Sequence, residues 1–252
     1  MPRSETTYYD NYWRGSSGWI PSDSLDYAQL QWIKLLANPG SKLLDVGCGD
    51  GSRYAQALLK AGIELHGIDV SHVAVEKATQ NNIQARQGTL DERLPYLDGQ
   101  FDAAICLEVF QHLLDPEYSI REIFRVLRPG GLLLTSVPNV ANWRSRFDML
   151  FFGRVRTGGS PRNRRYPWGD PHLRMFNLKA LGDLAGDVGF QVERKGGLHT
   201  NFLEQAPGIR RLTRWRTMKL LNSTCRAIGR RFPSLLAGRC ILLARKPADP
   251  AP

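Results

Sequence analysis

The sequence contains no long hydrophobic run. No stretch of its 252 residues approaches the ~20 consecutive apolar residues that a membrane-spanning helix needs. Residues 1–5 do not begin an apolar core, so we expect no signal peptide. Hydrophobic residues make up 42% of the chain and its mean hydropathy is −0.34, values typical of a soluble globular protein. The length suits one α/β domain with additions, or at most two small domains.

Cysteine is scarce and lacks the spacing of a metal site or a redox pair. The four cysteines, Cys48, Cys106, Cys225 and Cys240, include no C-x-x-C motif. Two of them fall in or beside expected strands. We therefore predict buried or incidental thiols in a reducing cytoplasm.

Acidic residues are missing from one long stretch. Residues 205–248 contain no aspartate or glutamate, but they contain eleven bases: Arg210, Arg211, Arg214, Arg216, Lys219, Arg226, Arg230, Arg231, Arg239, Arg245 and Lys246. Outside this stretch bases and acids nearly balance. The formal net charge of +10 therefore belongs to this one segment.

The same stretch has hydrophobic residues at three- and four-residue steps from Ile209 to Phe232. This spacing predicts a basic amphipathic helix over 206–238, or a broken pair because of Gly229 and Pro233. Three partners remain open: an anionic membrane surface, nucleic acid, or the protein's own core with a solvated basic back. Nucleic acid has the least support, because no recognisable RNA- or DNA-binding module stands beside the segment.

The glycine-rich stretch 43–51 is the strongest functional signal. Residues 43–46 form a short apolar run, glycines follow at 47, 49 and 51, and 52–61 has helical spacing. A strand, a glycine turn and a helix N-terminus let a ligand approach bare backbone amides. The spacing is G-x-G-x-G instead of the G-x-G-x-x-G of dinucleotide sites. Asp45, two positions before the first glycine, suits a cationic ligand better than a pyrophosphate.

A second carboxylate follows at the end of the next expected strand, 64–69. Asp69 stands 24 residues after Asp45. At the tip of the second strand of a βαβ unit it is placed to accept two hydrogen bonds from a ribose diol. Asp69 and Ser71 also precede the helical stretch 72–81, where either could act as an N-cap. Both roles are compatible.

These motifs together resemble those of the class I S-adenosylmethionine-dependent methyltransferases. D-x-G-x-G-x-G resembles the family's motif I. The segments Leu94-Pro95-Tyr96, Asp98-Gly99-Gln100-Phe101-Asp102 and Leu127-Arg128-Pro129-Gly130-Gly131 resemble those around its fourth and fifth strands. The resemblance covers roughly residues 40–200. It implies an α/β fold, a Rossmann-like, doubly wound, seven-stranded sheet whose last strand, 239–246, is antiparallel, and S-adenosylmethionine as the cofactor.

The resemblance also implies a set of cofactor-binding residues: Asp45, Gly47, Cys48, Gly49, Asp69, Val70, Thr89, Leu90 and Leu107. Leu107 would lie at the methionine end. Family members usually carry an acid directly after the glycine that follows the third strand, where it contacts the adenine amine. This chain has Thr89 there and its acids slightly later, at Asp91 and Glu92. The adenine contact therefore stays open.

Candidate catalytic residues follow the fourth strand. Glu108 and His112 are four residues apart, and one helical turn would place them on the same face. The run Glu108-Val109-Phe110-Gln111-His112 resembles the E-V-x-E-H segment of ubiquinone-pathway O-methyltransferases, where two glutamates and a histidine are associated with a divalent metal. Gln111 replaces the second glutamate, so we predict no metal site. His112 would be the general base for a hydroxyl acceptor, or a cap of the following loop.

A second resemblance lies in 137–176. Pro138-Asn139, Trp143-Arg144, Gly153-Arg154 and Pro171-His172-Leu173-Arg174 look like a segment shared by methyltransferases of bacterial surface-glycan pathways and by methionine-biosynthesis methyltransferase-like proteins. His172 and Arg174 would face the acceptor, with the arginine binding an anionic group, or would anchor a buried loop.

The N-terminal part is aromatic over 7–21, and a helix is expected over 22–37 with Leu25, Ala28, Trp32 and Leu35 on one face. It would form a lid over the cofactor or simply pack on the sheet. We thus expect a cap at 1–39, a methyltransferase core at 40–200, a basic insertion at 201–238, and a final strand and tail at 239–252. The preferred activity is O-methylation of a glycan or lipid-linked acceptor in the bacterial cytoplasm. The alternatives are a small quinone- or phenol-type acceptor and a non-catalytic regulatory partner.

Overall fold

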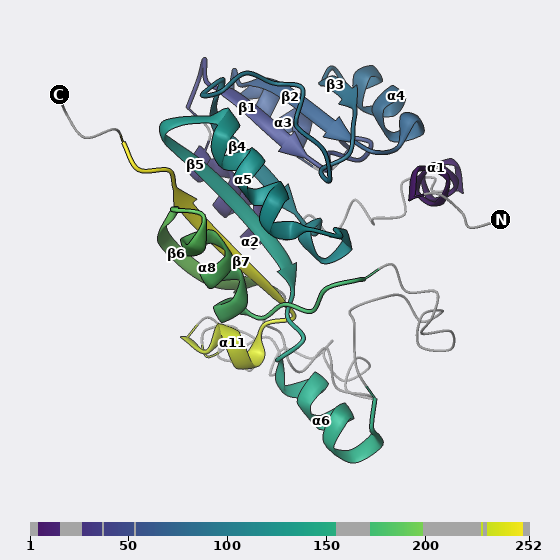
Figure 1. Ribbon diagram of the computed structural model, residues 1–252, viewed down its shortest axis with the longest axis vertical. Helices are drawn as coiled ribbons and strands as arrows, with labels where there is room; N and C mark the ends of the chain where they lie inside the picture. The colour runs from purple at the N-terminus through teal and green to yellow at the C-terminus, as the bar shows by residue number, and fades with distance from the viewer. Residues whose placement is uncertain are drawn as a thin grey trace, which may run out of the picture.

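A computed structural model describes residues 5–15, 27–36, 38–52, 54–154, 172–198, 228 and 231–248 (Figure 1). Three features considered from the sequence lie outside the described residues: Cys225, the loop 155–171 and most of the basic insertion. The prediction of a buried or incidental thiol at Cys225 therefore stays a prediction. At the end of that insertion a short helix, α11 (Pro233–Leu236), begins at Pro233. Within the described residues, no helix is long and apolar enough to cross a membrane.

The core is a seven-stranded sheet with the order β3-β2-β1-β4-β5-β7-β6. Its strands are β1 (Lys42–Val46), β2 (Glu64–Asp69), β3 (Gln84–Gln87), β4 (Phe101–Leu107), β5 (Leu127–Pro138), β6 (Gln191–Leu198) and β7 (Arg239–Arg245). The pairs among β1 to β5 are parallel, whereas β7 runs antiparallel to both β5 and β6. The predicted sheet, with its antiparallel last strand, is confirmed.

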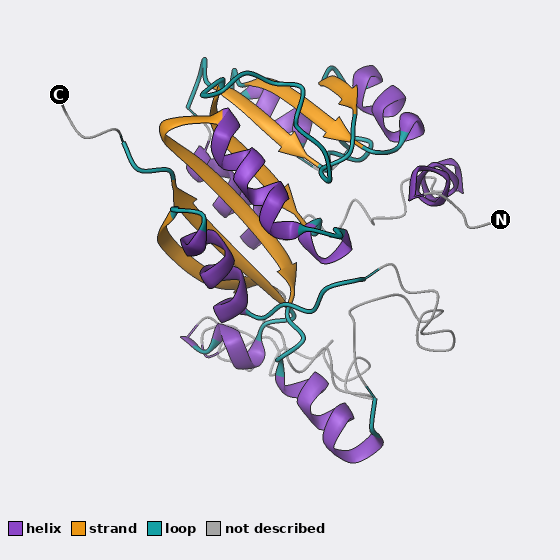
Figure 2. Cartoon of the chain, viewed as in Figure 1, coloured by secondary structure: helices purple, strands orange, loops and turns teal. Residues whose placement is uncertain are grey.

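Helices cover both faces of this sheet (Figure 2). The described helices are α1 (Glu5–Gly15), α2 (Tyr27–Ile33), α3 (Ala55–Lys60), α4 (His72–Gln80), α5 (Pro116–Val126), α6 (Trp143–Phe152), α8 (Leu178–Asp187) and α11, with 3-10 turns η2 (Lys34–Leu36) and η3 (Phe110–His112). Neighbouring strand residues point to opposite faces. Leu44 accordingly packs in the cluster under α5 and α8, whereas Leu43 packs in the cluster under α2 and α3.

Leu35 does not share the face of Trp32, contrary to what was expected for the second helix. Leu35 is 41% exposed, while Ile33 and Leu36 are buried and Trp32 packs against the core. The helix ends at Ile33 and tightens into η2, and this change of pitch rotates the following side chains. Trp32 lies on the outermost strand, where a Cβ on Gly196 would meet its ring at 2.6 Å.

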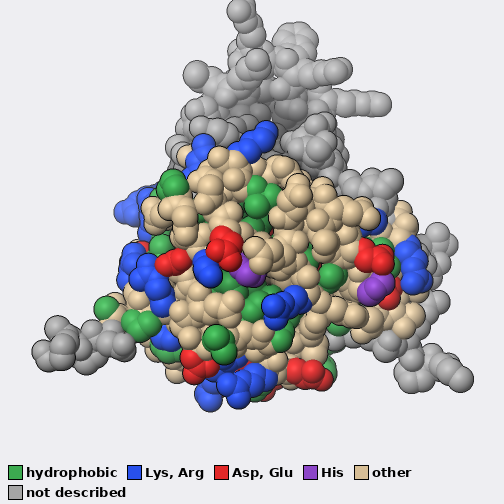
Figure 3. Space-filling model, turned by 90° about the horizontal axis from the view of Figure 1, so that it is seen from above, with side chains coloured by type: hydrophobic (Ala, Val, Ile, Leu, Met, Phe, Trp, Pro, Cys, Tyr) green, Lys and Arg blue, Asp and Glu red, His purple; other side chains and the backbone are tan. Residues whose placement is uncertain are grey.

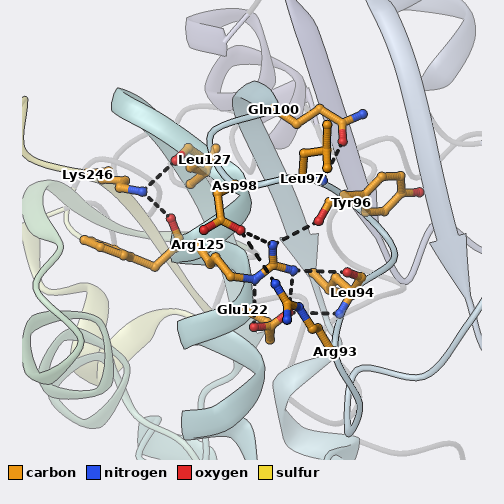
Figure 4. A network of polar contacts seen from close by, with 11 residues as sticks. Arg93, Leu94, Tyr96, Leu97, Asp98, Gln100, Glu122, Arg125, Leu127 and Lys246 are labelled. Atoms are coloured by element: carbon orange, nitrogen blue, oxygen red, sulfur yellow. Dashed lines mark hydrogen bonds and ion pairs between the residues drawn. The ribbon is translucent and has the colours of Figure 1, made fainter.

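An arginine network holds the loop between β3 and β4 on α5 (Figure 4). Arg125 donates to both carboxylate oxygens of Glu122 and to the carbonyls of Leu94 and Tyr96, and it pairs with Asp98. The hydrogen bonds from Arg125 lower the pKa of Glu122 below its usual value. Because these bonds are charge-assisted, they fix the course of the loop that leads from β3 back to the sheet.

Candidate active site

The glycine turn after β1 uses backbone that only glycine adopts without strain. Gly47, Gly49 and Gly51 have φ values of 72°, 55° and 69°. Their lack of a side chain also allows close packing. A Cβ on Gly47 would lie 2.5 Å from Cγ2 of Val109, and one on Gly49 would lie 2.6 Å from the ring of Trp13. The turn is therefore closed on two sides by residues that are far away in the sequence.

Asp45 lies at the bottom of this turn and is 1% exposed. The hydroxyl of Tyr54, just before α3, donates to its Oδ1 at 2.8 Å. Cys48 is buried beside it, and burial raises the pKa of its thiol well above the ordinary value, with the charge of Asp45 adding to the effect. Cys48 is thus a neutral wall of the site and not a nucleophile.

Asp69 is held by the backbone at the carboxyl end of β2. Its Oδ2 accepts from the Gly49 amide and its Oδ1 from the Ser71 amide, both at 2.9 Å. The N-cap of α4 is Ser71, whose side chain accepts from the Ala74 amide, so the capping role expected for Asp69 or Ser71 belongs to Ser71. Burial raises the pKa of Asp69. An ionised carboxylate has about four lone-pair sites, so these backbone bonds leave acceptor capacity for a further donor.

The ends of β2 and β3 are joined next to this carboxylate. The Gly88 amide donates to the Asp69 carbonyl at 3.0 Å, and the Gln87 side chain donates to the Val70 carbonyl at 3.1 Å. Thr89 uses its hydroxyl to accept from the Asp91 amide within the turn. Leu90, which follows Thr89, is buried. Val70, Thr89 and Leu90 therefore follow the carboxyl ends of β2 and β3, while their predicted contact with the cofactor stays a prediction.

Helix α1 lies against the same edge, beside α4 (Figure 1). Asp10 accepts from the Ser71 hydroxyl at 2.7 Å, and this bond lowers the pKa of Asp10. Lys77 donates to the Trp13 carbonyl at 2.5 Å. The Tyr9 ring meets the ring of His112 edge-on at 6.1 Å. Through these contacts α1 spans from the glycine turn to the residues that follow β4.

His112 and His172 are brought together although 60 residues separate them. Their rings stack at 4.7 Å between centroids with 25° between planes. The amides of Leu173 and Arg174 both donate to the Gln111 carbonyl, which holds the second histidine over the first. Arg174 itself donates to the Leu114 carbonyl at 2.5 Å. Arg174 therefore anchors its segment through this bond, but its side chain is exposed, unlike the buried anchor considered from the sequence.

Glu108 does not share a helical face with His112, so that expectation was wrong. The chain turns at Glu108 through a left-handed φ of 61°, and η3 begins only at Phe110. The Glu108 carboxylate instead accepts from the Ser136 hydroxyl at 2.8 Å and pairs with Arg239 at 3.3 Å. A left-handed backbone at a residue that is not glycine is strained and is typical of functional sites.

Sequence reasoning missed Ser136 and Arg239 as partners of Glu108. Both follow from topology, because β5 runs parallel to β4 and the antiparallel β7 starts where β5 ends. Pro138 is paired with Arg239 in this register. The prediction of an antiparallel last strand beginning at 239 therefore contained the signal for Arg239.

The methyltransferase domain family matches residues 25–195 of the chain. The chain belongs to the class I S-adenosylmethionine-dependent methyltransferases. Its relatives include the ubiquinone biosynthesis O-methyltransferase of Pseudomonas fluorescens (strain Pf0-1), 32% identical over 135 residues. That match covers 51% of this chain and 58% of the relative. The enzyme of the same name from Pseudomonas paraeruginosa (strain DSM 24068 / PA7) is 30% identical over 75% of this chain and 82% of its own.

Solved structures share the methyltransferase fold. A SAM-dependent methyltransferase from Aquifex aeolicus superposes with a TM-score of 0.57 at 17% identity, over 90% of this chain and 93% of that one. The [4+2]-cyclase SpnF has a TM-score of 0.57 at 25% identity, over 86% of this chain and 81% of that one. Since one of these neighbours is named for a different reaction, the fold alone does not define the chemistry.

S-adenosylmethionine is the cofactor of this methyltransferase family, and the residues present suit it. A buried carboxylate lies at the ribose position of the fold, beside a turn in which Gly47 and Gly49 carry no side chains. No group of three or more His, Cys, Asp or Glu that could hold a metal occurs among the described residues. Of the other thiols, Cys106 is fully buried, and burial raises the pKa of Cys240 to about 12.

Proposed function

We propose that this chain is an enzyme that transfers the methyl group of S-adenosylmethionine to a hydroxyl oxygen of a quinone- or phenol-type acceptor. The stacked pair of His112 and His172 beside the glycine turn is the observation that carries the proposal. The names of the ubiquinone-pathway relatives support this acceptor class. The glycan acceptor preferred from the sequence has no comparable support among the described residues.

The proposed cofactor site follows the carboxyl edge from β1 to β4. Asp69 would accept hydrogen bonds from the ribose hydroxyls, while Gly47, Cys48 and Gly49 would line the methionine part next to Asp45 and Leu107. Val70, Thr89 and Leu90 would flank the adenine. The cofactor supplies an electrophilic methyl group on a sulfonium, and these residues bind and orient it.

Helix α1 serves as the lid of this site in our proposal. Trp13 already lies on Gly49, and Asp10 is bonded to Ser71 next to Asp69. A helix held at these two points covers the ribose position and the glycine turn together. It would exclude water from the reacting groups, which strengthens every electrostatic interaction within the site.

His112 is the proposed general base. A methyl transfer to a hydroxyl is an in-line displacement, and the hydroxyl proton must leave as the new O–C bond forms. A neutral imidazole accepts that proton at its unprotonated ring nitrogen. The face of His112 packs on His172 and an edge contact comes from Tyr9, so the ring is held in one orientation. His172 is a positioning residue in this scheme.

Glu108 has a supporting role. Its carboxylate is already bonded to Ser136 and Arg239, so it joins the ends of β4, β5 and β7 beneath the acceptor region. Ser136 contacts one of its oxygens and Arg239 the other, so both are already engaged. We therefore assign proton removal to His112 and not to Glu108.

The test is transfer of a labelled methyl group from S-adenosylmethionine to a panel of soluble phenols and catechols. His112→Ala should lower turnover on the order of 10²–10⁴-fold, while calorimetry shows unchanged cofactor affinity. Asp69→Ala should instead lower the cofactor affinity, by roughly 1.5–3 kcal/mol of binding free energy. His172→Ala should lower turnover less than His112→Ala, and His172→Phe, which keeps a flat ring, should restore part of it.

Full turnover in a folded His112→Ala variant would remove the general-base assignment. Wild-type protein that binds the cofactor tightly but methylates no hydroxyl compound would contradict the proposed function. That outcome would favour the non-catalytic regulatory partner considered from the sequence.

A further inference from the structure

Helix α6 exposes most of its large apolar side chains to water. Its apolar patch consists of Phe147, Met149, Leu150, Phe151 and Phe152, whose exposed fractions run from 45% for Phe147 to 77% for Leu150. Ser145 is the one buried residue of the helix. Phe147, Leu150 and Phe151 lie at i, i+3 and i+4 and therefore share a face. A contiguous apolar surface of this kind marks an interaction site.

The patch is linked to the candidate active site through the segment 172–176. At one end, Leu173 and Arg174 donate to the Gln111 carbonyl beside His112. At the other end, the Val140 amide donates to the Phe176 carbonyl, just before α6 begins. The segment contributes two further exposed apolar side chains, Leu173 and Met175. Apolar surface thus lies along the connection from the edge of the site to α6.

The charges around the patch are mainly positive. α6 carries Arg144 and Arg146, Arg154 follows it with its guanidinium 5.7 Å from the Phe152 ring, and Asp148 is its one acid. The exposed Phe232 and Arg231 lie next to α11, at the same end of the molecule (Figure 1). Figure 3 shows the opposite end, where acidic and basic side chains are interspersed and hydrophobic ones are scattered.

We propose that α6 is an interfacial helix that binds the surface of an anionic lipid bilayer. Its aromatic and aliphatic side chains would enter the boundary between headgroups and acyl chains, and its arginines would bind anionic headgroups. A second copy of this chain fits the patch poorly, because two identical faces would bring like charges together. The segment 172–176 would then lie along the bilayer, so an apolar acceptor could reach His112 without crossing water.

Only the access of an apolar acceptor from the bilayer to His112 rests on the proposed function. The bilayer contact itself depends on the exposed patch and its charges. It differs from the sequence analysis, which kept an anionic membrane surface as one of three possible partners of 206–238. The two hypotheses are separable because the α6 residues can be changed without touching that segment.

The experiment is sedimentation of the full chain with vesicles of phosphatidylglycerol and phosphatidylethanolamine, or of phosphatidylcholine alone. The double variant Leu150→Gln/Phe151→Gln should lower the partition coefficient on anionic vesicles on the order of tenfold or more, since two apolar side chains no longer leave water. The matched control is Leu97→Gln, because Leu97 is 78% exposed but lies in the β3–β4 loop. It should bind like the wild type. Binding should also fall as salt rises.

Wild-type protein that ignores anionic vesicles would overturn the inference, and so would a double variant that binds as tightly as the wild type. A dimer in solution that the double variant abolishes would assign the patch to a second copy and would also overturn it. Methyl transfer to a soluble acceptor separates the two proposals. The double variant should keep that activity, whereas vesicle binding without any methyl transfer would support the α6 inference and contradict the proposed function alone.

Discussion

At the carboxyl ends of β1 and β2 the functional carboxylates are buried and hydrogen-bonded, whereas after β5 the chain leaves large apolar side chains in water. Asp69 is held by two amides, and Asp45 is bonded to Tyr54. In α6, by contrast, only Ser145 is buried. Both regions lie at the same edge of one sheet, but the first is rigidly specified and the second is open.

The difference corresponds to two tasks within one reaction. A cofactor site must bind the same molecule in every turnover, so a fixed arrangement of glycines and carboxylates lowers the cost of binding. An acceptor region that faces another phase, or a larger partner, must leave surface available. We therefore expect mutations near the glycine turn to act on the whole fold and those in α6 to act locally.

The largest expected effect is that of Gly47→Ala. The alanine would have to adopt the left-handed backbone of Gly47, with a φ of 72°. Its Cβ would also lie 2.5 Å from Cγ2 of Val109. A left-handed backbone costs an L-residue about 1–2 kcal/mol and overpacking about 1–3 kcal/mol, so the free energy of unfolding should fall by about 2–5 kcal/mol. Urea denaturation measures it, and cofactor affinity should fall in parallel.

Gly40→Ala is the matched control for the backbone term. Gly40 has a φ of 83°, but a Cβ there would meet nothing within 4 Å. The free energy of unfolding of this variant should fall only by the ~1–2 kcal/mol that a left-handed backbone costs an L-residue. Equal losses in the two variants would show that the contact of Val109 with the glycine turn adds nothing to stability.

Most of the cofactor half could be predicted from the sequence because its signals are local. The glycine spacing, the apolar runs and the segment Arg128-Pro129-Gly130 each act over a few residues, and together they indicated the order of elements. Asp69 could be placed because a strand end fixes where the next side chain points. The sequence could not decide whether Asp69 or Ser71 caps α4, since both stand before the helix.

The remaining features depend on contacts between distant parts of the chain. The orientation of Glu108 follows from Ser136 and Arg239, which reach it only through the register of β5 and β7. His112 meets His172 because the Gln111 carbonyl holds the segment that carries it. The exposure of the apolar face of α6 could not be predicted from the sequence either. The residue pattern of an apolar helix is the same whether another element covers that face or not.

A smaller effect is expected for Glu122→Gln, which tests the network that fixes the β3–β4 loop. Glu122 is largely buried and accepts from Arg125 and from the Leu94 amide, so its loss should cost about 1–3 kcal/mol at pH 7. The hydrogen bonds from Arg125 hold the folded pKa of Glu122 below the ordinary glutamate value of 4.5. Its stabilisation is therefore complete above that value and is lost as pH falls through the lowered pKa.

The control lies on the same helix. Glu117 pairs with Arg121 at the same α5 surface, but both side chains are more than half exposed. Glu117→Gln should change the free energy of unfolding by at most about 0.5 kcal/mol. If the two variants lost equal stability at pH 7, or if the loss in Glu122→Gln did not shrink as the pH was lowered below 4.5, the network would not hold the loop as described.

The smallest expected effect compares two helix caps of the same chemistry. The Asn177 side chain accepts from the Ala180 amide at the start of α8, and the Asn142 side chain accepts from the Ser145 amide at the start of α6. Replacing such an asparagine by alanine costs about 1 kcal/mol of helix stability. α8 buries Leu178 and Leu181 in the core, so Asn177→Ala should lower the global free energy of unfolding by that amount.

Asn142→Ala should instead leave global unfolding unchanged within about 0.5 kcal/mol, because α6 can unfold while the sheet stays intact. Hydrogen exchange should show the loss as roughly two- to thirtyfold faster exchange of the α6 amides, the range that corresponds to 0.5–2 kcal/mol. Anionic vesicles should slow this exchange again, since an interfacial helix keeps its backbone bonds when its apolar face leaves water. A global loss equal to that of Asn177→Ala would show that α6 unfolds together with the sheet. It would then be a rigid part of the core fold, and its exposed face would need an explanation other than local freedom at an interface.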